Sequence, residues 1–223
     1  MARVEADLAP ALHLPAGEFL ALRAVTADDA EALQAYVRAL SPEARYNRFF
    51  GALQELPPAE LERVTHLDRR YDLALLAEVG AGAASIVIGE ARHAFVPERC
   101  ECEFALSVAD AWRGRGIGTL LIGEMERRAR RLGGRRLTAE TLRDNEPMKA
   151  LALKAGFSMT DMPSDARLVR IVMDLATSHT DRFWKNPRHA RYASRRVAAR
   201  AIQGQRLRFS GVDQFNLRPS PPC

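Results

Sequence analysis

A predicted strand, a glycine-rich turn and a predicted helix follow one another without interruption between residues 101 and 132, and this succession constrains the fold more than any other feature. In residues 101–108 (ECEFALSV) the side chains alternate in twos, which predicts a strand with one apolar face and one face that carries Glu101 and Glu103. After the turn, apolar residues recur every three or four positions as far as Leu132, the spacing of an amphipathic helix. The chain is therefore expected to pass directly from a strand, through glycines, into the first turn of a helix.

The turn between them (RGRGIG) places glycines at positions 114, 116 and 118. Glycine lets the backbone adopt positive φ and approach a ligand closely, and a helix N-terminus offers free N–H donors and a partial positive charge. The implied ligand is a phosphate or pyrophosphate. A dinucleotide-binding fold would need Gly-x-Gly-x-x-Gly, but Thr119 stands at the third position, and no P-loop Gly-Lys-Ser/Thr occurs. The alternative to a phosphate site is an ordinary strand-to-helix turn.

The elements that follow complete a family-specific order. We expect a second strand over residues 136–142, then a short helix that a Gly-Phe pair ends, then another strand. In this order the chain resembles the GNAT superfamily of acyl-CoA-dependent N-acyltransferases, whose signature Gln/Arg-x-x-Gly-x-Gly/Ala is matched by Arg113, Gly116 and Gly118. The downstream asparagine of that superfamily is matched by Asn145, and its Gly-Phe pair is also present.

The resemblance implies the GNAT fold, an α+β architecture in which helices flank a central, mostly antiparallel, twisted mixed sheet that splays at the cofactor site. It covers about residues 22–175, so we assign the acetyltransferase domain to residues 18–176, with a last strand at 168–175 that closes the sheet. Residues 1–17 are expected to be a mobile lead-in. Residues 177–223 are expected to be a basic, solvated or disordered tail.

The basic character of the chain belongs to that tail. The whole chain has a net charge of +5, whereas residues 177–223 alone contain ten Lys or Arg and two Asp, a charge of +8. The alternative to a solvated extension is weak, strongly salt-dependent binding of the tail to nucleic acid or an acidic partner. We expect no nucleic-acid partner for the rest of the chain.

Composition indicates a soluble, cytoplasmic protein without a membrane partner. No apolar run approaches the roughly 20 residues that span a bilayer, and the first 30 residues lack a basic start followed by an apolar block. Cys100 and Cys102 form a Cys-x-Cys pair, but no cluster of His or Cys accompanies it. We therefore expect no metal and buried, reduced thiols.

Residues 40–50 (LSPEARYNRFF) carry a narrower resemblance. They are similar to the GNAT domains of bacterial protein-lysine acetyltransferases, which are often joined to cyclic-nucleotide or acyl-CoA-synthetase-like domains. In GNAT folds such early helices form part of the acceptor side of the cleft. The alternative is simple helix packing by the aromatic side chains, with Arg45 and Arg48 in solvent.

Transfer of an acyl group to an amine requires the amine to be neutral. Because the lysine pKa is about 10.4, deprotonation at pH 7 costs roughly 4.6 kcal/mol, and a positioned base removes a large part of this barrier. Glu103 is the candidate base, because it lies on the carboxylate face of the strand and matches the Glu-bearing position of the protein-acetylating group. Glu101 is either a second carboxylate that raises the pKa of Glu103 or a solvated edge charge, and we expect the second.

The resemblance also implies how acetyl-CoA binds as co-substrate. A backbone N–H of the splayed strand receives the negative charge of the tetrahedral intermediate, and the same backbone pairs with the pantetheine arm. The turn binds the pyrophosphate through its N–H groups, with added charge from the arginines. The expected cofactor-binding residues are Leu106, Ser107, Val108, Arg113, Gly114, Arg115, Gly116, Ile117, Gly118, Thr119 and Asn145, the last near the thioester end or on an ordered water.

The chain departs from the superfamily at one position. Many members carry a tyrosine that protonates the leaving thiolate, but this chain has Ala152 there. A thiolate with a pKa of about 8.5 can leave without an acid. The leading hypothesis is thus an acetyl-CoA-dependent N-acetyltransferase with a protein lysine as acceptor. The alternatives are acetylation of a small amine and a non-catalytic acyl-CoA-sensing module.

Overall fold

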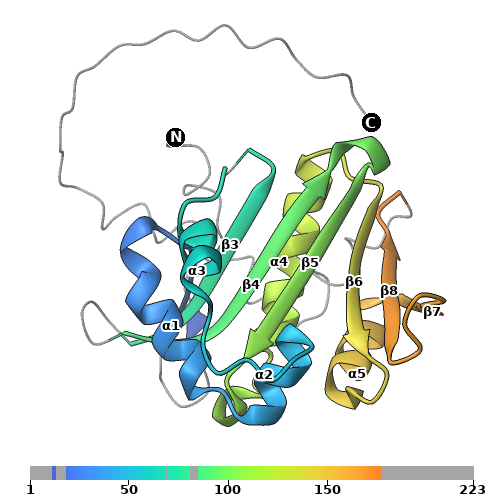
Figure 1. Cartoon of the computed structure of the whole chain (residues 1–223). Helices are drawn as coiled ribbons and strands as arrows, with labels where there is room; N and C mark the ends of the chain where they lie inside the picture. Colours follow the sequence, from blue (N-terminus) through green and yellow to red (C-terminus); the bar gives the residue numbers. More distant parts are fainter. Residues whose placement is uncertain (1–11, 14–18, 69, 81–84, 177–223) are drawn as a thin grey trace, which may run out of the picture.

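The computed structural model describes residues 12–13, 19–68, 70–80 and 85–176 (Figure 1). The predicted tail lies outside these residues. Of the predicted lead-in, only Leu12–His13 is described, and this pair forms a short strand beside β2 (Phe19–Ala24).

The described strands form one sheet of eight, in the spatial order β1-β2-β3-β4-β5-β6-β8-β7. All neighbours are antiparallel except β5 and β6, which are parallel, so the predicted mixed, mostly antiparallel sheet is confirmed. The strands are β1 (Leu12–His13), β2 (Phe19–Ala24), β3 (Asp72–Val79), β4 (Ile86–Val96), β5 (Glu101–Val108), β6 (Arg136–Leu142), β7 (Ser158–Asp161) and β8 (Leu168–Asp174).

The expectation that the last strand closes the sheet is wrong. β8 pairs with β6 on one side and with β7 on the other, so the shorter β7 forms the edge. The chain passes from α5 (Glu146–Ala155) to this edge and returns inward through β8. β8 alternates between buried and partly exposed residues, the pattern of a strand with one face in the core.

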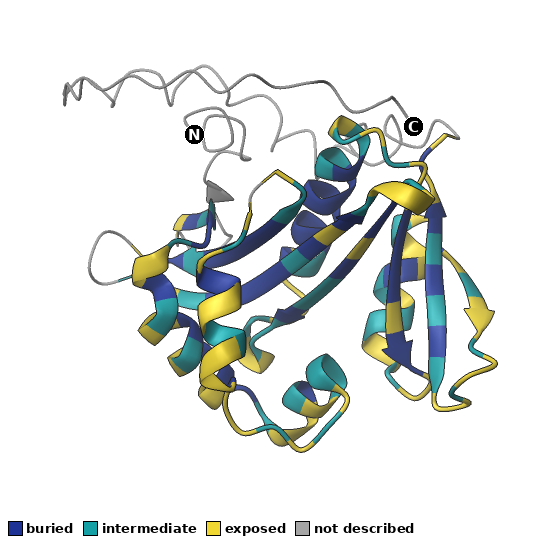
Figure 2. Ribbon diagram, turned by 45° about the horizontal axis from the view of Figure 1, so that its top comes forward, coloured by how far each residue is buried: buried dark blue, intermediate teal, exposed yellow. Residues whose placement is uncertain are grey.

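Helices cover both faces of the sheet and create two apolar clusters (Figures 1 and 2). α4 and α5 pack on one face, and α1, α2 and α3 lie on the other. β3 supplies side chains to both clusters, Leu73 and Leu75 to the first and Ala74 and Leu76 to the second, which explains its unbroken apolar sequence. The helices are α1 (Ala30–Ala39), α2 (Pro42–Phe49), α3 (Pro58–Thr65), α4 (Ile117–Arg131) and α5 (Glu146–Ala155).

Local signals position the first two helices. Thr26 and Asp29 form a capping box in the 3-10 turn that leads into α1. Ser41 caps α2, its hydroxyl accepting a hydrogen bond from the N–H of Ala44 at 3.1 Å, and Pro42 takes the first helical position. α2 ends at Phe50, which adopts the left-handed conformation at φ 57°.

The parallel strands β5 and β6 diverge along their length. They pair only over residues 101–103 and 136–138, whereas β4 and β5 pair over eight positions. Beyond these residues the carboxyl ends of the two strands separate, with the ends of α2 and α5 nearby (Figure 1). The predicted splay is therefore present, and it opens the sheet at the start of α4.

Candidate active site

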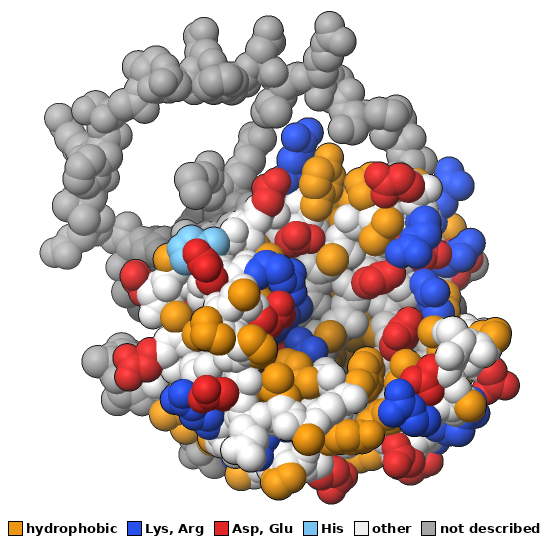
Figure 3. All heavy atoms as spheres, in the orientation of Figure 1, with side chains coloured by type: hydrophobic (Ala, Val, Ile, Leu, Met, Phe, Trp, Pro, Cys, Tyr) orange, Lys and Arg blue, Asp and Glu red, His pale blue; other side chains and the backbone are white. Residues whose placement is uncertain are grey.

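A cavity of about 570 Å³ occupies the splay. It reaches from the glycine turn, between β5 and β6, to α2 on the opposite side of the sheet. Figure 3 shows this face of the molecule hollowed near its centre, with charged side chains along one wall and hydrophobic side chains along the lower edge. Its principal lining residues are Ala44, Asn47, Arg48, Phe50, the segment 103–108, Trp112, Arg113, Gly114, the segment 116–119, the segment 138–141, Asn145, Pro147, Met148, Leu151, Lys154 and Arg170.

The glycine turn has the backbone geometry of an anion site at two of its three glycines. Gly114 and Gly116 have φ of 74° and 88°, and Gly116 is the N-cap of α4. Gly118 lies inside the helix without positive φ, so the expectation of an unusual φ there is wrong. Close packing explains the glycine at this position instead, because a Cβ on residue 118 would lie 2.9 Å from Cδ2 of Leu151 on α5.

The first N–H groups of α4 face the same cavity. Ile117, Gly118 and Thr119 belong to the first turn, which has no intrahelical acceptors for its N–H groups, and all three residues line the cavity. This turn therefore combines donors with the positive end of the helix dipole.

The backbone of β5 supplies further donors. Ala109 donates its N–H to the Ile88 carbonyl of β4 at 2.8 Å. Because N–H groups of an antiparallel strand alternate in direction, those of Leu106 and Val108 point away from β4, into the splay. The N–H group of Ser107 points toward β4, so Ser107 lines the cavity through its side chain. Two of the three predicted β5 residues thus offer a backbone edge to a ligand.

Charged side chains at the turn differ in their placement. Arg113 lines the cavity and pairs with Asp110 at 3.1 Å. Arg115 lies with its guanidinium 4.4 Å from the ring centre of Trp112 and is not part of the lining. Lys154 of α5, which sequence reasoning did not select, lines the cavity instead. Of these three cationic residues, Arg113 and Lys154 line the cavity.

Asn145 lines the cavity but is already engaged. Its Oδ1 accepts the N–H of Met148 at 3.2 Å as the N-cap of α5, and its Nδ2 donates to Oγ1 of Thr141 at 3.1 Å. One amide hydrogen is left for a ligand. Ala152, which stands where many superfamily members have tyrosine, is fully buried.

Glu103 lies at the point where the strands separate. It is the last β5 residue paired with β6, its side chain is half exposed, and it lines the cavity. Its Oε1 accepts a hydrogen bond from Nη2 of Arg99 at 2.6 Å. The predicted base therefore stands between the cofactor turn and the face covered by α2.

The interpretation of Glu101 as a solvated edge charge is wrong. Its residue is only 5% exposed, and its carboxylate accepts hydrogen bonds from Arg136 at 3.0 Å and Arg170 at 3.1 Å. Ser107 on the same face is also buried. The carboxylate face of β5 is therefore covered, and Glu103 is its exposed member.

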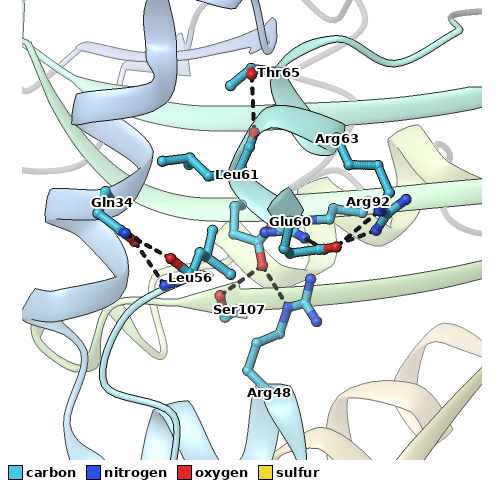
Figure 4. A network of polar contacts seen from close by, with 10 residues as sticks. Gln34, Arg48, Leu56, Glu60, Leu61, Arg63, Thr65, Arg92 and Ser107 are labelled. Carbon is cyan, nitrogen blue, oxygen red and sulfur yellow. Dashed lines mark hydrogen bonds and ion pairs between the residues drawn. The ribbon is translucent and has the colours of Figure 1, made fainter. Parts of the chain in front are cut away.

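A buried charge network fixes α2 against the sheet (Figure 4). Glu90 of β4 accepts hydrogen bonds from Arg48 of α2 at 2.5 Å, from Arg92 at 2.9 Å and from the hydroxyl of Ser107 at 3.3 Å. Burial acts to raise the pKa of Glu90, but the two guanidinium groups outweigh it and hold the pKa at about 2. The alternative that Arg48 is solvated is wrong, since only 10% of its side chain is exposed.

The network continues on both sides of Glu90. Arg92 also donates to Glu60 of α3 at 2.7 Å. Because Ser107 donates to Glu90, the buried hydroxyl of Tyr36 donates to Ser107, at 2.9 Å. All three helices of this face are thus tied to the sheet beside the cavity.

Several lining residues were missed by sequence reasoning, and they share one feature. Except for Trp112, in the turn before α4, they lie on β6, β8 and α5, where no local motif marks a ligand. The face alternation of 136–142 could have indicated Thr138 and Glu140, but only the pairing of Thr138 with Glu103 of β5 brings this face of β6 to the cavity. The missed residues include Trp112, Thr138, Glu140, Met148, Leu151, Lys154 and Arg170.

Two further searches concern the described part of the chain alone. No group of three or more His, Cys, Asp or Glu residues in it is arranged to hold a metal ion. None of its helices combines the length and the apolar character that a membrane span requires.

Comparison with known proteins identifies this arrangement. The sequence profile of the Acetyltransferase (GNAT) family matches residues 30–157, more than half of the chain. Acetyltransferase PA5475 of Pseudomonas aeruginosa is 29% identical over 153 residues, which cover 69% of this chain and 82% of the relative. Acetyltransferase Pat of Mycolicibacterium smegmatis is 32% identical over 143 residues, which cover 63% of this chain and only 41% of Pat.

Solved structures agree with the sequence relatives. The GNAT domain of S. lividans PAT superimposes with a TM-score of 0.67 at 28% identity, covering 74% of this chain and 96% of that domain. A cAMP-binding acyltransferase from Mycobacterium smegmatis gives a TM-score of 0.50 at 25% identity, covering 75% of this chain and 47% of that protein. Profile, relatives and fold coincide on the segment that builds the cavity, and the chain belongs to the GNAT family of acetyltransferases.

Proposed function

We propose that this acetyltransferase transfers the acetyl group of acetyl-CoA to the side-chain amine of a protein lysine, with Glu103 as general base. The observation that carries the proposal is the position of Glu103. Its half-exposed carboxylate lines the same cavity as the glycine turn, at the residue where β5 leaves β6.

The cavity suits acetyl-CoA, the co-substrate of the GNAT family, in its charge and in its free backbone groups. The N–H groups at the start of α4, with Arg113 and Lys154, would hold the pyrophosphate. The N–H groups of Leu106 and Val108 would pair with the pantetheine arm, and one of them would stabilise negative charge on the carbonyl oxygen. Acetyl-CoA supplies the activated thioester.

In the proposed reaction, Glu103 accepts a proton from the incoming ammonium group. The neutral amine then attacks the thioester carbonyl and forms the C–N bond. The C–S bond breaks as the carbonyl re-forms, its electron pair leaves on the sulfur, and the second proton of the nitrogen passes to solvent or to the departing thiolate. Because the pKa of an ordinary thiol is about 8.5, the thiolate needs no acid at neutral pH, which agrees with Ala152 at the usual tyrosine position.

Support for a protein lysine as acceptor comes from α2. Its segment 40–50 is similar to the GNAT domains of bacterial protein-lysine acetyltransferases, and the helix forms the wall of the cavity opposite the glycine turn. A lysine side chain is long and narrow enough to reach Glu103 from that side. We place the reaction in the cytoplasm, where acetyl-CoA and unmodified lysines are both available.

The test measures thiol release from acetyl-CoA with a mixture of cytoplasmic proteins and with a panel of small amines, followed by mass spectrometry. We expect acetyl groups on specific lysines, and Glu103→Gln should lower kcat at least about 100-fold while the KM for acetyl-CoA stays the same. Glu98→Gln removes an equal charge from an exposed residue outside the cavity and should act like wild type.

Two results would contradict separate parts of the proposal. If Glu103→Gln retains more than a third of the wild-type kcat, Glu103 is not the base. If acetyl groups appear only on a small amine, the acceptor is a metabolite rather than a protein lysine.

A further inference from the structure

Thr138 presents a buried hydroxyl without a partner to the cavity. The residue is 2% exposed, and its Oγ1 has no hydrogen-bond partner in the described part of the chain. Leaving a buried hydroxyl unpaired costs about 1–3 kcal/mol, so such a group beside a cavity is expected to meet a ligand. Because the hydroxyl has two lone pairs, it can accept a hydrogen bond from an ammonium group.

Glu140 lies two residues further along β6 and therefore on the same face of the strand as Thr138. It is exposed and lines the cavity, and the structure shows no ion pair for it among the described residues. Its neighbour across the β6–β8 pair is Arg170, but the Nη2 of Arg170 donates to Glu101. The carboxylate of Glu140 is thus available to a cation in the cavity.

Register places this pair beside the proposed base. Thr138 is the β6 partner of Glu103, and partners in a parallel pair direct their side chains to the same face. The other guanidinium groups around this face are engaged with other carboxylates: Arg48 and Arg92 with Glu90, Arg136 with Glu101, and Arg99 with Glu103. The face therefore offers two carboxylates and one unpaired hydroxyl to a positively charged group.

We propose that Thr138 and Glu140 form the subsite that binds the acceptor as an ammonium ion, before Glu103 removes its proton. This inference rests on the proposed function and specifies its acceptor side. Glu140 is a specificity-determining residue in this scheme, since it selects cationic primary amines, and the hydroxyl of Thr138 orients the nitrogen. Proton removal belongs to Glu103.

The test measures binding rather than turnover. Nα-acetyl-lysine amide is titrated into the full chain saturated with CoA, which has no acetyl group to transfer, and the dissociation constant is obtained by NMR or calorimetry. We expect Glu140→Gln to raise this constant at least fivefold and to leave the Kd of CoA within twofold. Nα-acetyl-norleucine amide, which lacks the ammonium group, should not discriminate between wild type and variant.

Controls separate the subsite from general effects. Glu62→Gln removes a charge from an exposed residue outside the cavity and should bind the lysine probe like wild type. Thr138→Val should weaken binding of the probe, and Thr138→Ser, which keeps the hydroxyl, should restore it. Equal constants for wild type and Glu140→Gln, or no binding of the probe to wild type, would overturn the inference. Glu140-dependent binding without any acetyl transfer would uphold the subsite and reject the proposed function.

Discussion

Replacing Glu90 with glutamine tests whether the buried charge network holds α2 in place. Glu90 is 1% exposed and accepts hydrogen bonds from Arg48 and Arg92, so the substitution leaves two largely buried guanidinium groups without their common carboxylate. The cavity wall formed by α2 depends on the same contact. We expect the variant to fold, with a lower free energy of unfolding.

The magnitude follows from the pKa of Glu90. A fall from the ordinary 4.5 to about 2 corresponds to about 3 kcal/mol of folding stability at neutral pH. The general cost of removing one partner of a buried ion pair, about 3–5 kcal/mol, agrees with this figure. Because the folded-state pKa is depressed, this contribution is complete above about pH 5 and is lost as the pH falls toward 2. About 2 kcal/mol of it should be gone at pH 3.

The assay is urea unfolding of wild type and Glu90→Gln at pH 7, 4 and 3. The difference between them should be about 3 kcal/mol at pH 7, about 2.5 at pH 4 and about 1 at pH 3. Groups that titrate in both proteins cancel in this difference. Glu55 forms an exposed ion pair with Arg38, so Glu55→Gln should lower the free energy of unfolding by less than about 1 kcal/mol. This difference from wild type should stay the same at all three pH values. The reasoning fails if Glu90→Gln costs no more than this control, or if the difference stays constant with pH.

Three further substitutions have expected outcomes. Gly116→Ala forces a side chain onto φ 88°, which should cost about 1–2 kcal/mol in thermal unfolding and weaken acetyl-CoA binding in a titration. Asn145→Ala removes the cap on the N–H of Met148 and should cost about 1 kcal/mol, measured by urea unfolding. Burial lowers the pKa of His93 from 6.5 to about 4, so between pH 7 and pH 5 the unfolded chain takes up a proton that the folded chain does not. The free energy of unfolding of wild type should therefore fall by about 2 kcal/mol over this range. His93→Met should abolish that loss, and an unchanged pH dependence would show that His93 is not the group responsible.

The sequence predicted an element correctly where a short-range residue pattern defines that element. Alternation in twos predicted β5 with the bounds that the structure has, and the glycine turn at 113–118 marked the region where α4 begins, at Ile117. β6 was likewise predicted at residues 136–142. The family resemblance added the splay between β5 and β6, which no local pattern contains.

Errors arose where a residue's environment depends on distant partners. Glu101 was expected in solvent, but Arg136 and Arg170, 35 and 69 residues away, cover and pair it. Arg48 was left between two interpretations because its partner, Glu90, lies 42 residues further along the chain. Strand order failed for the same reason, since β8 shows which faces are buried but not which strand it pairs with.

The two walls of the cavity are connected through one carboxylate. Asp110, in the turn before α4, accepts hydrogen bonds from the hydroxyl and the N–H of Ser41 at the start of α2, at 3.0 and 3.1 Å, and also pairs with Arg113. At its other end, α2 is held by Arg48 on Glu90. The helix proposed to form the acceptor side is thus fixed at both ends, once to the sheet and once to the turn proposed to bind pyrophosphate. Since both anchors are contacts between the chain's own residues, they hold the proposed acceptor wall in one position relative to the turn and the sheet.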